Sequence, residues 1–289
     1  MNAGIVERIA SLIHETSSSL PEDVERALGA AARREERGGP AAVVLKTILD
    51  NVRLARSAGT PLCQDTGTLT FFVDESLRRV VTPAVLKKAV AAATERGWLR
   101  RNTIDSVSGA SRDDNCAEGA PVVHYRDGGA GPGRVTLLMK GGGSENMSRQ
   151  YSLPDTGLGA GRDLAGVRKC VLDAVTEAQG YGCAPGILGV CVGGDRATGY
   201  EVAKEQLLRP LADRSENPSL RALERSLLKE ANELGIGPMG LGGRTTLLGL
   251  KMASRPRVPA SFFVTVAYMC WAARRRTVVI GAKSGGRAG

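Results

Sequence analysis

The chain has 289 residues, of which 42% are hydrophobic and 24% charged, and its formal net charge is +9. This composition is ample for a buried core, whereas six cysteines are too few for a disulfide-stapled scaffold. The chain has only four Phe, two Trp and five Tyr, and no basic-aromatic module. The positive charge therefore favours an anionic small substrate or an acidic partner subunit over nucleic acid.

The sequence lacks the signals of secretion or membrane insertion. The N-terminus is amphipathic and carries an early acid, unlike a signal peptide. The longest apolar stretch, residues 258–273, includes Pro259, Ser261 and Thr265 and is shorter than the ~20 residues of a membrane span. We therefore expect a cytoplasmic protein with no membrane association, in which reduced cysteines serve as metal ligands or catalytic groups.

Hydrophobic periodicity and turn residues predict an α+β chain without βαβ alternation. We expect one domain over residues 1–276, with a helical N-terminal part over about 1–57, and a disordered basic tail over 277–289. The predicted elements are helices near 5–13, 21–37 and 41–55, a strand at 69–73, a helix at 83–97, strands at 121–125 and 134–139, a helix at 164–179, a strand at 187–192, two helices of which the second begins after Asn217 and ends before Gly235, and strands at 245–252 and 262–267.

Three cysteines stand out because they lie in or beside loops, far apart in sequence. Cys63 lies in the Pro- and Gly-containing stretch 60–67, Cys183 lies in the similar stretch 180–186, and Cys270 closes an apolar run. Buried structural cysteines normally pack on regular elements, whereas loops bring reactive groups together. Three converging thiolates would suit an iron–sulfur cluster or a metal ion with one open position. A surface turn with a spare cysteine accounts equally well for the stretch around Cys63.

Two glycine-rich stretches follow or precede predicted strands. Residues 140–146 offer a run of backbone N–H groups that can hold a carboxylate or phosphate, although the ending of a P-loop is missing. Residues 235–246 permit close backbone approach. A purely structural connection also explains each of them.

Together these motifs resemble the alpha subunit, or N-terminal region, of class I fumarase and L-tartrate dehydratase, which are iron–sulfur hydro-lyases. The resemblance covers about residues 40–276 and implies a helix-rich α+β chain around a small mixed sheet. The motifs that carry it, in order, are Cys63-Gln-Asp-Thr-Gly67, Lys140-Gly-Gly-Gly-Ser-Glu-Asn146, Gly182-Cys183 through Gly193-Gly194, Gly237-Pro-Met-Gly-Leu-Gly-Gly243 and Cys270-Trp-Ala-Ala-Arg274.

The resemblance implies a 4Fe-4S cluster held by Cys63, Cys183 and Cys270. Three thiolates instead of four leave one iron open to act as a Lewis acid on a departing hydroxyl. The same family pattern implies that the backbone amides near Gly142 and Gly143 hold a substrate carboxylate.

The family pattern also assigns roles to side chains beside the first cysteine. Asp65 would be part of the acid/base machinery, and Gln64 would contact the substrate. Arg100 would pair with a substrate carboxylate, which a guanidinium matches bidentately, and its neighbour Arg101 is the alternative.

The remaining cysteines and the two histidines have structural interpretations. Cys170 borders the apolar face of a predicted helix and Cys191 lies within a predicted strand, so both are expected in the core. Cys116 is the one rival ligand. His14 and His124, on a helix and a strand, are expected to be structural.

One departure from the family pattern concerns an active-site histidine before the third cysteine. Residues 255–261 contain none, and Val258 stands at its place, just after Arg255 and Arg257. These arginines are near enough in sequence to reach the same pocket, which favours an altered substrate. A non-catalytic paralogue subunit and a mononuclear metal enzyme, with zinc on three thiolates, remain alternatives.

The chain lacks the family's beta region, which supplies further substrate contacts. We therefore expect a separate beta subunit, assembly as a dimer of heterodimers, and a small anionic carboxylate substrate, namely a hydroxy-dicarboxylate.

Overall fold

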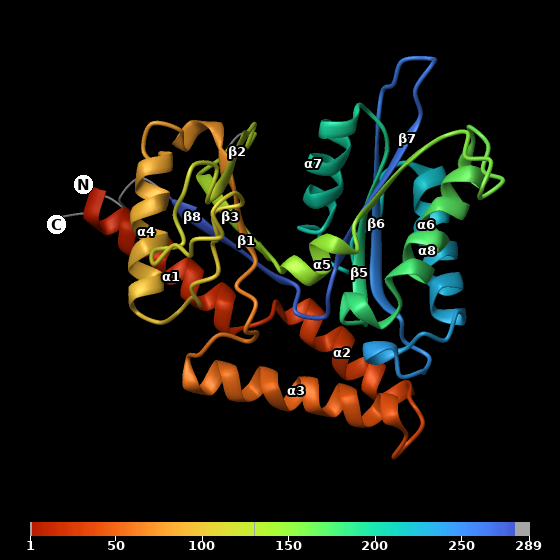
Figure 1. The fold of residues 1–289 in the computed structure, drawn as a ribbon, viewed down its shortest axis with the longest axis horizontal. Coiled ribbons are helices and arrows are strands. Elements are labelled where there is room, and N and C mark those ends of the chain that lie inside the picture. Colours follow the sequence, from red (N-terminus) through yellow and green to blue (C-terminus); the bar gives the residue numbers. More distant parts are fainter. Residues whose placement is uncertain (1, 130, 281–289) are drawn as a thin grey trace, which may run out of the picture. The chain divides into compact units, whose positions relative to one another are not determined.

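The computed structural model describes residues 2–129 and 131–280, and the chain divides into two compact units (Figure 1). Unit 1 comprises Met1–Pro21, Val52–Lys140 and Arg274–Gly289, and unit 2 comprises Glu22–Asn51 and Gly141–Ala273. Each unit has a four-stranded sheet and a hydrophobic core of its own. The single domain over 1–276 stays a prediction.

The sheet of unit 1 has the order β2-β1-β3-β8. Strand β1 is parallel to β2 and antiparallel to β3, and β8 is antiparallel to β3. Every residue of β1 after Thr68 is buried, as expected of an interior strand covered on both faces. The strands are β1 (Thr68–Asp74), β2 (Val122–Arg126), β3 (Gly133–Lys140) and β8 (Arg274–Ile280).

Two helices of unit 1, α1 (Asn2–Ser18) and α4 (Pro83–Glu95), pack against each other, and both contribute to the core of the sheet. Helix α4 begins where the sequence predicts, because the Thr82 hydroxyl accepts a hydrogen bond from the Val85 N–H at 3.4 Å and Pro83 occupies the first turn. The short helix η1 (Glu75–Leu77) follows β1.

The sheet of unit 2 has the order β4-β7-β5-β6. Strand β5 is parallel to β6 and antiparallel to β7, and β4 pairs antiparallel with β7. The start of β5 and the end of β7 therefore lie at one end of this sheet, and the β6–β7 connection lies at the other. The strands are β4 (Arg149–Ser152), β5 (Gly186–Gly193), β6 (Leu247–Arg255) and β7 (Phe263–Met269).

Helices cover both faces of this second sheet (Figure 1). The apolar sides of α6 (Leu164–Ala178) and α8 (Pro218–Glu233) form one core with residues of β5, β6 and β7. Helix α7 (Arg196–Gln206) packs on the other face, where β5 presents Gly189. The remaining helices are α2 (Glu22–Arg34) in unit 2, α3 (Pro40–Ala58) with residues in both units, and the short α5 (Gly142–Asn146), η2 (Gln179–Gly182) and η3 (Pro238–Gly240) in unit 2.

The predicted α+β class is confirmed, and the predicted helices and strands are present. The described residues form two small sheets where we expected one. The sequence did not predict the short helices η1, η2 and η3, the short helix α5, which we interpreted as a loop, or the polar strands β4 and β8. Because β8 extends to Ile280, residues 277–280 of the predicted tail pair with β3, while 281–289 lie outside the described residues. In the described part of the chain, no helix is long and apolar enough to span a bilayer.

Candidate functional site

The loop with the first candidate cysteine, residues 63–67, lies in unit 1 between α3 and β1. The Leu62 N–H donates to the Ser17 carbonyl at 2.8 Å. The buried Thr66 hydroxyl donates to the Arg100 carbonyl and accepts from the Arg100 N–H, at 2.9 Å each. Thr66 thus fixes the loop to the segment that carries Arg100.

Asn102 adds a second attachment to the same loop. In the amide orientation that satisfies both of its polar atoms, its oxygen accepts from the N–H groups of Thr66 and Gly67 at 3.2 Å each. Within the loop, the Asp65 N–H donates to the Cys63 sulfur at 3.4 Å. The thiol and the carboxylate are therefore held on one tightly turned piece of backbone.

Three predicted substrate-site residues are gathered at this loop. Gln64 and Arg100 are exposed, and the Arg100 Nη1 donates to the Gln64 Oε1 at 3.4 Å. Asp65 is half-buried between Gln64 and Thr66. This loop and the segment attached to it accordingly carry a thiol, an amide, a carboxylate and a guanidinium.

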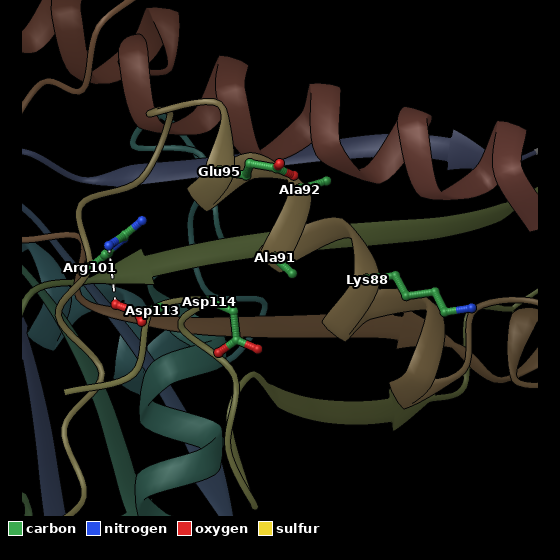
Figure 2. A pocket seen from close by; sticks show the side chains of 7 residues that line it. All are labelled: Lys88, Ala91, Ala92, Glu95, Arg101, Asp113 and Asp114. Carbon is green, nitrogen blue, oxygen red and sulfur yellow. Dashed lines mark hydrogen bonds and ion pairs between the residues drawn. The ribbon is translucent and has the colours of Figure 1, made fainter. Parts of the chain in front are cut away.

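Arg101, the alternative to Arg100, has a different environment. Its Nη1 pairs with the exposed Asp113 at 3.1 Å. Figure 2 shows this pair at the side of an open hollow of about 500 Å³ over α4. Both carboxylates and cationic side chains line this hollow, so its charge does not favour the binding of an anion. It is lined by Lys88, Ala91, Ala92, Glu95, Arg101, Asp113 and Asp114.

Arg274, the first residue of β8 in unit 1, contacts the same loop from another side. Its side chain is only 1% exposed, and its Nη2 donates to the Asp65 carbonyl at 2.8 Å. Its Nε and Nη1 are buried and have no hydrogen-bond partner among the described residues. The sequence indicated Arg274 only as the end of a motif, because the burial of one arginine in an Arg-Arg-Arg run leaves no signal in the pattern.

The other two candidate cysteines lie together in unit 2. Cys183 follows η2 with left-handed backbone angles (φ 50°, ψ 58°), and Cys270 directly follows β7. The Trp271 N–H donates to the Cys183 carbonyl at 3.2 Å. Both cysteines are half-buried. The structure thus brings these two predicted ligands to one end of the sheet.

Tyr268 explains the glycines beside Cys183. Its ring is 1% exposed, and a Cβ at Gly182 or Gly186 would lie 2.4 or 2.6 Å from ring atoms. Burial, followed by the neighbouring charges of Cys270 and Cys183, raises the pKa of Tyr268. The two glycines therefore let a large buried ring support the backbone that carries Cys183.

Gly142 and Gly143 form the start of α5, also in unit 2. Helix α5 contacts η2, which leads directly into Cys183, and β7. Both glycines are exposed, and a Cβ at Gly143 would meet nothing within 4 Å. Packing therefore gives no reason for a glycine at position 143.

The remaining cysteines are poor ligand candidates. Cys170 and Cys191 are fully buried, and burial raises their pKa values to about 12 and about 11. Their predicted place in the core is confirmed. The Cys116 thiol donates to the carbonyls of Lys87 and Asp114 at 3.4 Å each. Burial, and then the Asp114 charge, raise the pKa of Cys116, which disfavours the thiolate that a metal needs.

The two histidines have structural contacts, as predicted. The His14 Nε2 lies 2.8 Å from the Gly59 carbonyl oxygen, and its ring stacks on Trp98 with centroids 4.4 Å apart. His124 stacks on Phe72 at 5.2 Å.

The stretch that lacks the family histidine forms the connection between β6 and β7. Val258 is 64% exposed. The Arg257 Nη1 donates to the carbonyls of Val258, Pro259 and Ser261 at 3.2 Å each, and its guanidinium lies 4.5 Å from the centre of the Phe262 ring. Arg257 therefore stabilises its own loop.

This β6–β7 loop lies at the wrong end of the sheet for the role we expected. Ile187, near Cys183, pairs with Met269, which precedes Cys270, whereas Gly193 pairs with Arg255 at the start of the loop. At ~3.3 Å per residue, Ile187 and Gly193 are roughly 20 Å apart along β5. Within one chain, Arg255 and Arg257 therefore lie at the end of the sheet opposite to Cys183 and Cys270.

Comparison with known proteins decides the family. The profile of fumarate hydratase (Fumerase) matches residues 6–279. The chain belongs to the fumarase family. This confirms the resemblance seen in the sequence.

The relatives of this fumarase-family chain include both long proteins and alpha subunits. It is 49% identical, over 97% of its length, to a Geobacillus stearothermophilus protein named "Putative fumarate hydratase class I", of which it covers 56%. It is 31% identical, over 94% of its length, to a Methanocaldococcus jannaschii protein named "Putative L(+)-tartrate dehydratase subunit alpha", of which it covers 95%. It is 30% identical, over 96% of its length, to the L(+)-tartrate dehydratase subunit alpha of Escherichia coli O157:H7, of which it covers 90%. The chain thus spans about half of the first relative and nearly all of the others.

The three loop cysteines of this fumarase-family chain have the chemistry that an iron–sulfur cluster requires. Cys63, Cys183 and Cys270 are half-buried, in contrast to the fully buried Cys170 and Cys191. In residues 2–129 and 131–280, no three His, Cys, Asp or Glu side chains form a ready-made metal-binding group. Two thiols lie in unit 2 and one in unit 1. The ligand set stays a prediction.

Four residues around the candidate site were missed by sequence reasoning. Thr66 and Asn102 hold the first cysteine loop, Arg274 holds the Asp65 carbonyl, and Tyr268 supports the second loop. Each acts through a contact with a residue far away in the sequence, and no local pattern marks such contacts.

Proposed function

We propose that this chain is the alpha subunit of a 4Fe-4S hydro-lyase that adds water to, or removes it from, a small hydroxy-dicarboxylate. The observation that carries the proposal is the loop Cys63-Gln64-Asp65, which presents a thiol, an amide and a carboxylate next to the Arg100 guanidinium. Family membership supports the reaction class.

The cluster would be held by Cys63, Cys183 and Cys270. When bound, it supplies a Lewis-acidic iron for the departing hydroxyl, since three thiolates leave one coordination position open. The N–H of Asp65 would continue to donate to the Cys63 sulfur, a contact of the kind that stabilises thiolate ligands.

Substrate carboxylates would be bound by the exposed polar groups. The guanidinium of Arg100 can hold a carboxylate through two parallel hydrogen bonds, and the Gln64 amide can donate a third. The exposed backbone at Gly142 and Gly143 offers further N–H donors. These contacts would also stabilise the negative charge that develops next to a carboxylate during proton removal.

Asp65 is the proposed acid/base group. In dehydration the C–O bond would break with its electron pair leaving on hydroxide, and Asp65 would take the proton from the neighbouring carbon as the C–H electron pair forms the double bond. The hydroxide and this proton together make up the water that is released. In hydration Asp65 returns that proton. The backbone of Asp65 is fixed on both sides, by its N–H to the Cys63 sulfur and by its carbonyl to Arg274, and this fixes where the carboxylate can act.

A separate beta subunit would complete the enzyme. Two relatives bear alpha-subunit names, and the Geobacillus relative is nearly twice as long as this chain. We propose that the beta subunit supplies the remaining substrate contacts and that the complex is a dimer of heterodimers. A cytoplasmic location would keep the thiols reduced.

The test is to purify the chain without oxygen, alone and with a candidate beta subunit, and to measure iron, sulfide, zinc and visible absorption. We expect iron and sulfide in the chain, and turnover of malate, fumarate or tartrate by the complex. A colourless, iron-free protein after reconstitution would contradict the cluster. Zinc without sulfide would indicate a mononuclear metal enzyme, and a cluster without turnover would indicate a non-catalytic subunit.

A further inference from the structure

Arg274 combines complete burial with an incomplete set of hydrogen-bond partners. Its side chain is 1% exposed, its Nη2 donates to the Asp65 carbonyl, and its Nε and Nη1 are buried without partners among the described residues. A guanidinium stays charged in proteins, and a buried charge without compensation is costly. A bound anion that accepts hydrogen bonds from Nε and Nη1 would compensate this buried charge.

A second arginine on the same strand has an acidic partner. Arg276 is half-buried, its Nη1 pairs with Glu15 at 3.3 Å, and only its Nε is buried without a hydrogen-bond partner among the described residues. Arg274 has no such carboxylate contact in the described residues, because Asp65 offers it a backbone carbonyl. Strand β8 therefore contains Arg276, which has an acidic partner, and Arg274, which lies at the candidate site without one.

A second buried cationic residue lies at the same end of the sheet of unit 1, on the neighbouring strand β3. Arg274 lies opposite Met139 in β3, and the next residue, Lys140, is also only 1% exposed. Lys140 in turn lies opposite Thr68, the residue that follows the loop 63–67. Two buried cationic residues thus lie where the cysteine loop enters the sheet.

We propose that Arg274 is a positioning residue of the iron–sulfur centre. Its Nη2 holds the backbone of the Cys63–Asp65 loop through the Asp65 carbonyl, and its Nε and Nη1 donate hydrogen bonds to the anionic cluster and its thiolate ligands. The inference rests on the proposed function. A resident group is favoured over the substrate because Arg274 is sealed from solvent, whereas Gln64 and Arg100, which an incoming carboxylate can meet, are exposed.

Two physical consequences follow. Hydrogen bonds to cluster sulfurs and nearby charge set the reduction potential, so loss of a cation here should lower that potential. Partners of metal ligands typically contribute about 10- to 100-fold to metal affinity. Loss of the Arg274 contacts should therefore speed removal of iron by about 10-fold or more.

The test compares Arg274→Gln, Arg274→Lys and the matched control Arg276→Gln with the unaltered chain, all reconstituted without oxygen. Three quantities are measured: the rate of iron removal by a chelator, the midpoint potential from a spectroscopic redox titration, and the melting of the iron-free proteins. The KM for the substrate is measured in the complex with the beta subunit.

We expect Arg274→Gln to lose iron about 10-fold faster, at a lower potential, while the control matches the unaltered chain. Arg274→Lys should keep the potential but lose iron at an intermediate rate, because an ammonium cannot both hold the carbonyl and reach the anion. If the iron-free Arg274→Gln protein does not fold, the rate of iron loss from Arg274→Lys decides whether the assignment holds.

An unchanged rate of iron loss in every folded Arg274 variant overturns the assignment. A raised KM with an unchanged rate of iron loss and an unchanged potential also overturns it, because Arg274 would then contact the substrate and not the cluster. An unaltered chain that takes up no cluster refutes the proposed function itself, and this inference with it. A normal cluster in the unaltered chain, with no effect of the Arg274 variants, refutes this inference alone.

Discussion

At the residue scale, the arginines of this chain show that neighbours in sequence can have opposite environments. Arg100 contacts Gln64 beside the candidate site, whereas Arg101 pairs with Asp113 at a separate hollow. Arg274 is sealed against the Asp65 carbonyl, whereas Arg276 pairs with Glu15. The role of each guanidinium depends on its tertiary contacts, and charge alone does not distinguish them.

Arg100→Lys should weaken substrate binding in the complete complex, because an ammonium cannot hold a carboxylate bidentately. We expect a loss of about 1.5–3 kcal/mol in kcat/KM, the range of hydrogen bonds to charged groups. Arg101→Lys is the matched control and should change kcat/KM little. Steady-state kinetics check this, and a larger loss for Arg101→Lys would transfer the role to that residue.

Cys63→Ser should abolish cluster binding, because it removes a thiolate ligand. Cys170→Ser should leave the iron content unchanged, although placing a hydroxyl in the core should cost about 1–3 kcal/mol of stability. Iron and sulfide analysis after reconstitution, together with urea unfolding, measures both effects. Loss of iron in the Cys170 variant would show that the ligand assignment is incomplete.

Tyr151 provides a test of pH dependence. Its hydroxyl donates to the Asp173 Oδ2 at 2.8 Å, and burial, followed by Asp173, raises the pKa of Tyr151 above its usual value near 10. A raised folded-state pKa means that this contribution is complete below pH 10 and is lost as the pH rises further.

Tyr151→Phe should therefore lower the free energy of unfolding by about 0.5–1.5 kcal/mol at neutral pH. It should also flatten the decline in stability above pH 10. Urea unfolding at pH 7 to 11 measures both. Tyr181→Phe, at a site 78% exposed, is the control and should follow the unaltered chain. An alkaline decline as steep in Tyr151→Phe as in the unaltered chain would contradict the explanation.

At the element scale, the sheet of unit 2 depends on close approach between α7 and β5. A Cβ at Gly189 would lie 2.0 Å from the Ala203 carbonyl oxygen of α7. This explains a glycine inside a buried strand, where it otherwise weakens the strand. Asp195 caps the start of helix α7, because its carboxylate accepts hydrogen bonds from the N–H groups of Ala197 and Thr198.

Gly189→Ala should push α7 away from the sheet and destabilise unit 2 by about 1–3 kcal/mol. Gly4→Ala, in the exposed part of α1 with nothing within 4 Å of the added Cβ, is the matched control. It should stabilise the chain by about 0.5–1 kcal/mol, since alanine favours helix. Thermal or urea unfolding separates the two, and equal effects would contradict the packing argument.

At the scale of the whole molecule, the direction of the strands decides which loops can share a site. Because β5 is antiparallel to β7, Cys183 and Cys270 lie at one end of the sheet and Val258 lies beyond the other. The missing histidine therefore does not leave a gap beside these two cysteines within one chain.

Val258→His should leave the iron content and the order of preference among malate, fumarate, tartrate and substituted succinates unchanged. The reason is the separation of roughly 20 Å along β5, estimated at ~3.3 Å per residue. Substrate assays of the complex with and without the substitution check this. A changed preference would show that the loop reaches a site formed by another chain.

The sequence by itself determined the α+β class, the main helices and strands, the family, and the separation of loop cysteines from core cysteines. These follow from local periodicity, caps such as Thr82, and motifs whose residues are adjacent in the chain. It also indicated Cys63, Gln64 and Asp65 together, because consecutive residues on one turn are necessarily close.

Only the tertiary structure decided which distant groups meet. The strand β8 was hidden because its first three residues are arginines, and the burial of Arg274 depends on the loop around Asp65, which lies 209 positions earlier. The placement of Val258 away from Cys270 depends on the antiparallel course of β6 and β7. Such facts arise from strand pairing and from the burial of charge between remote segments, which no local sequence pattern contains.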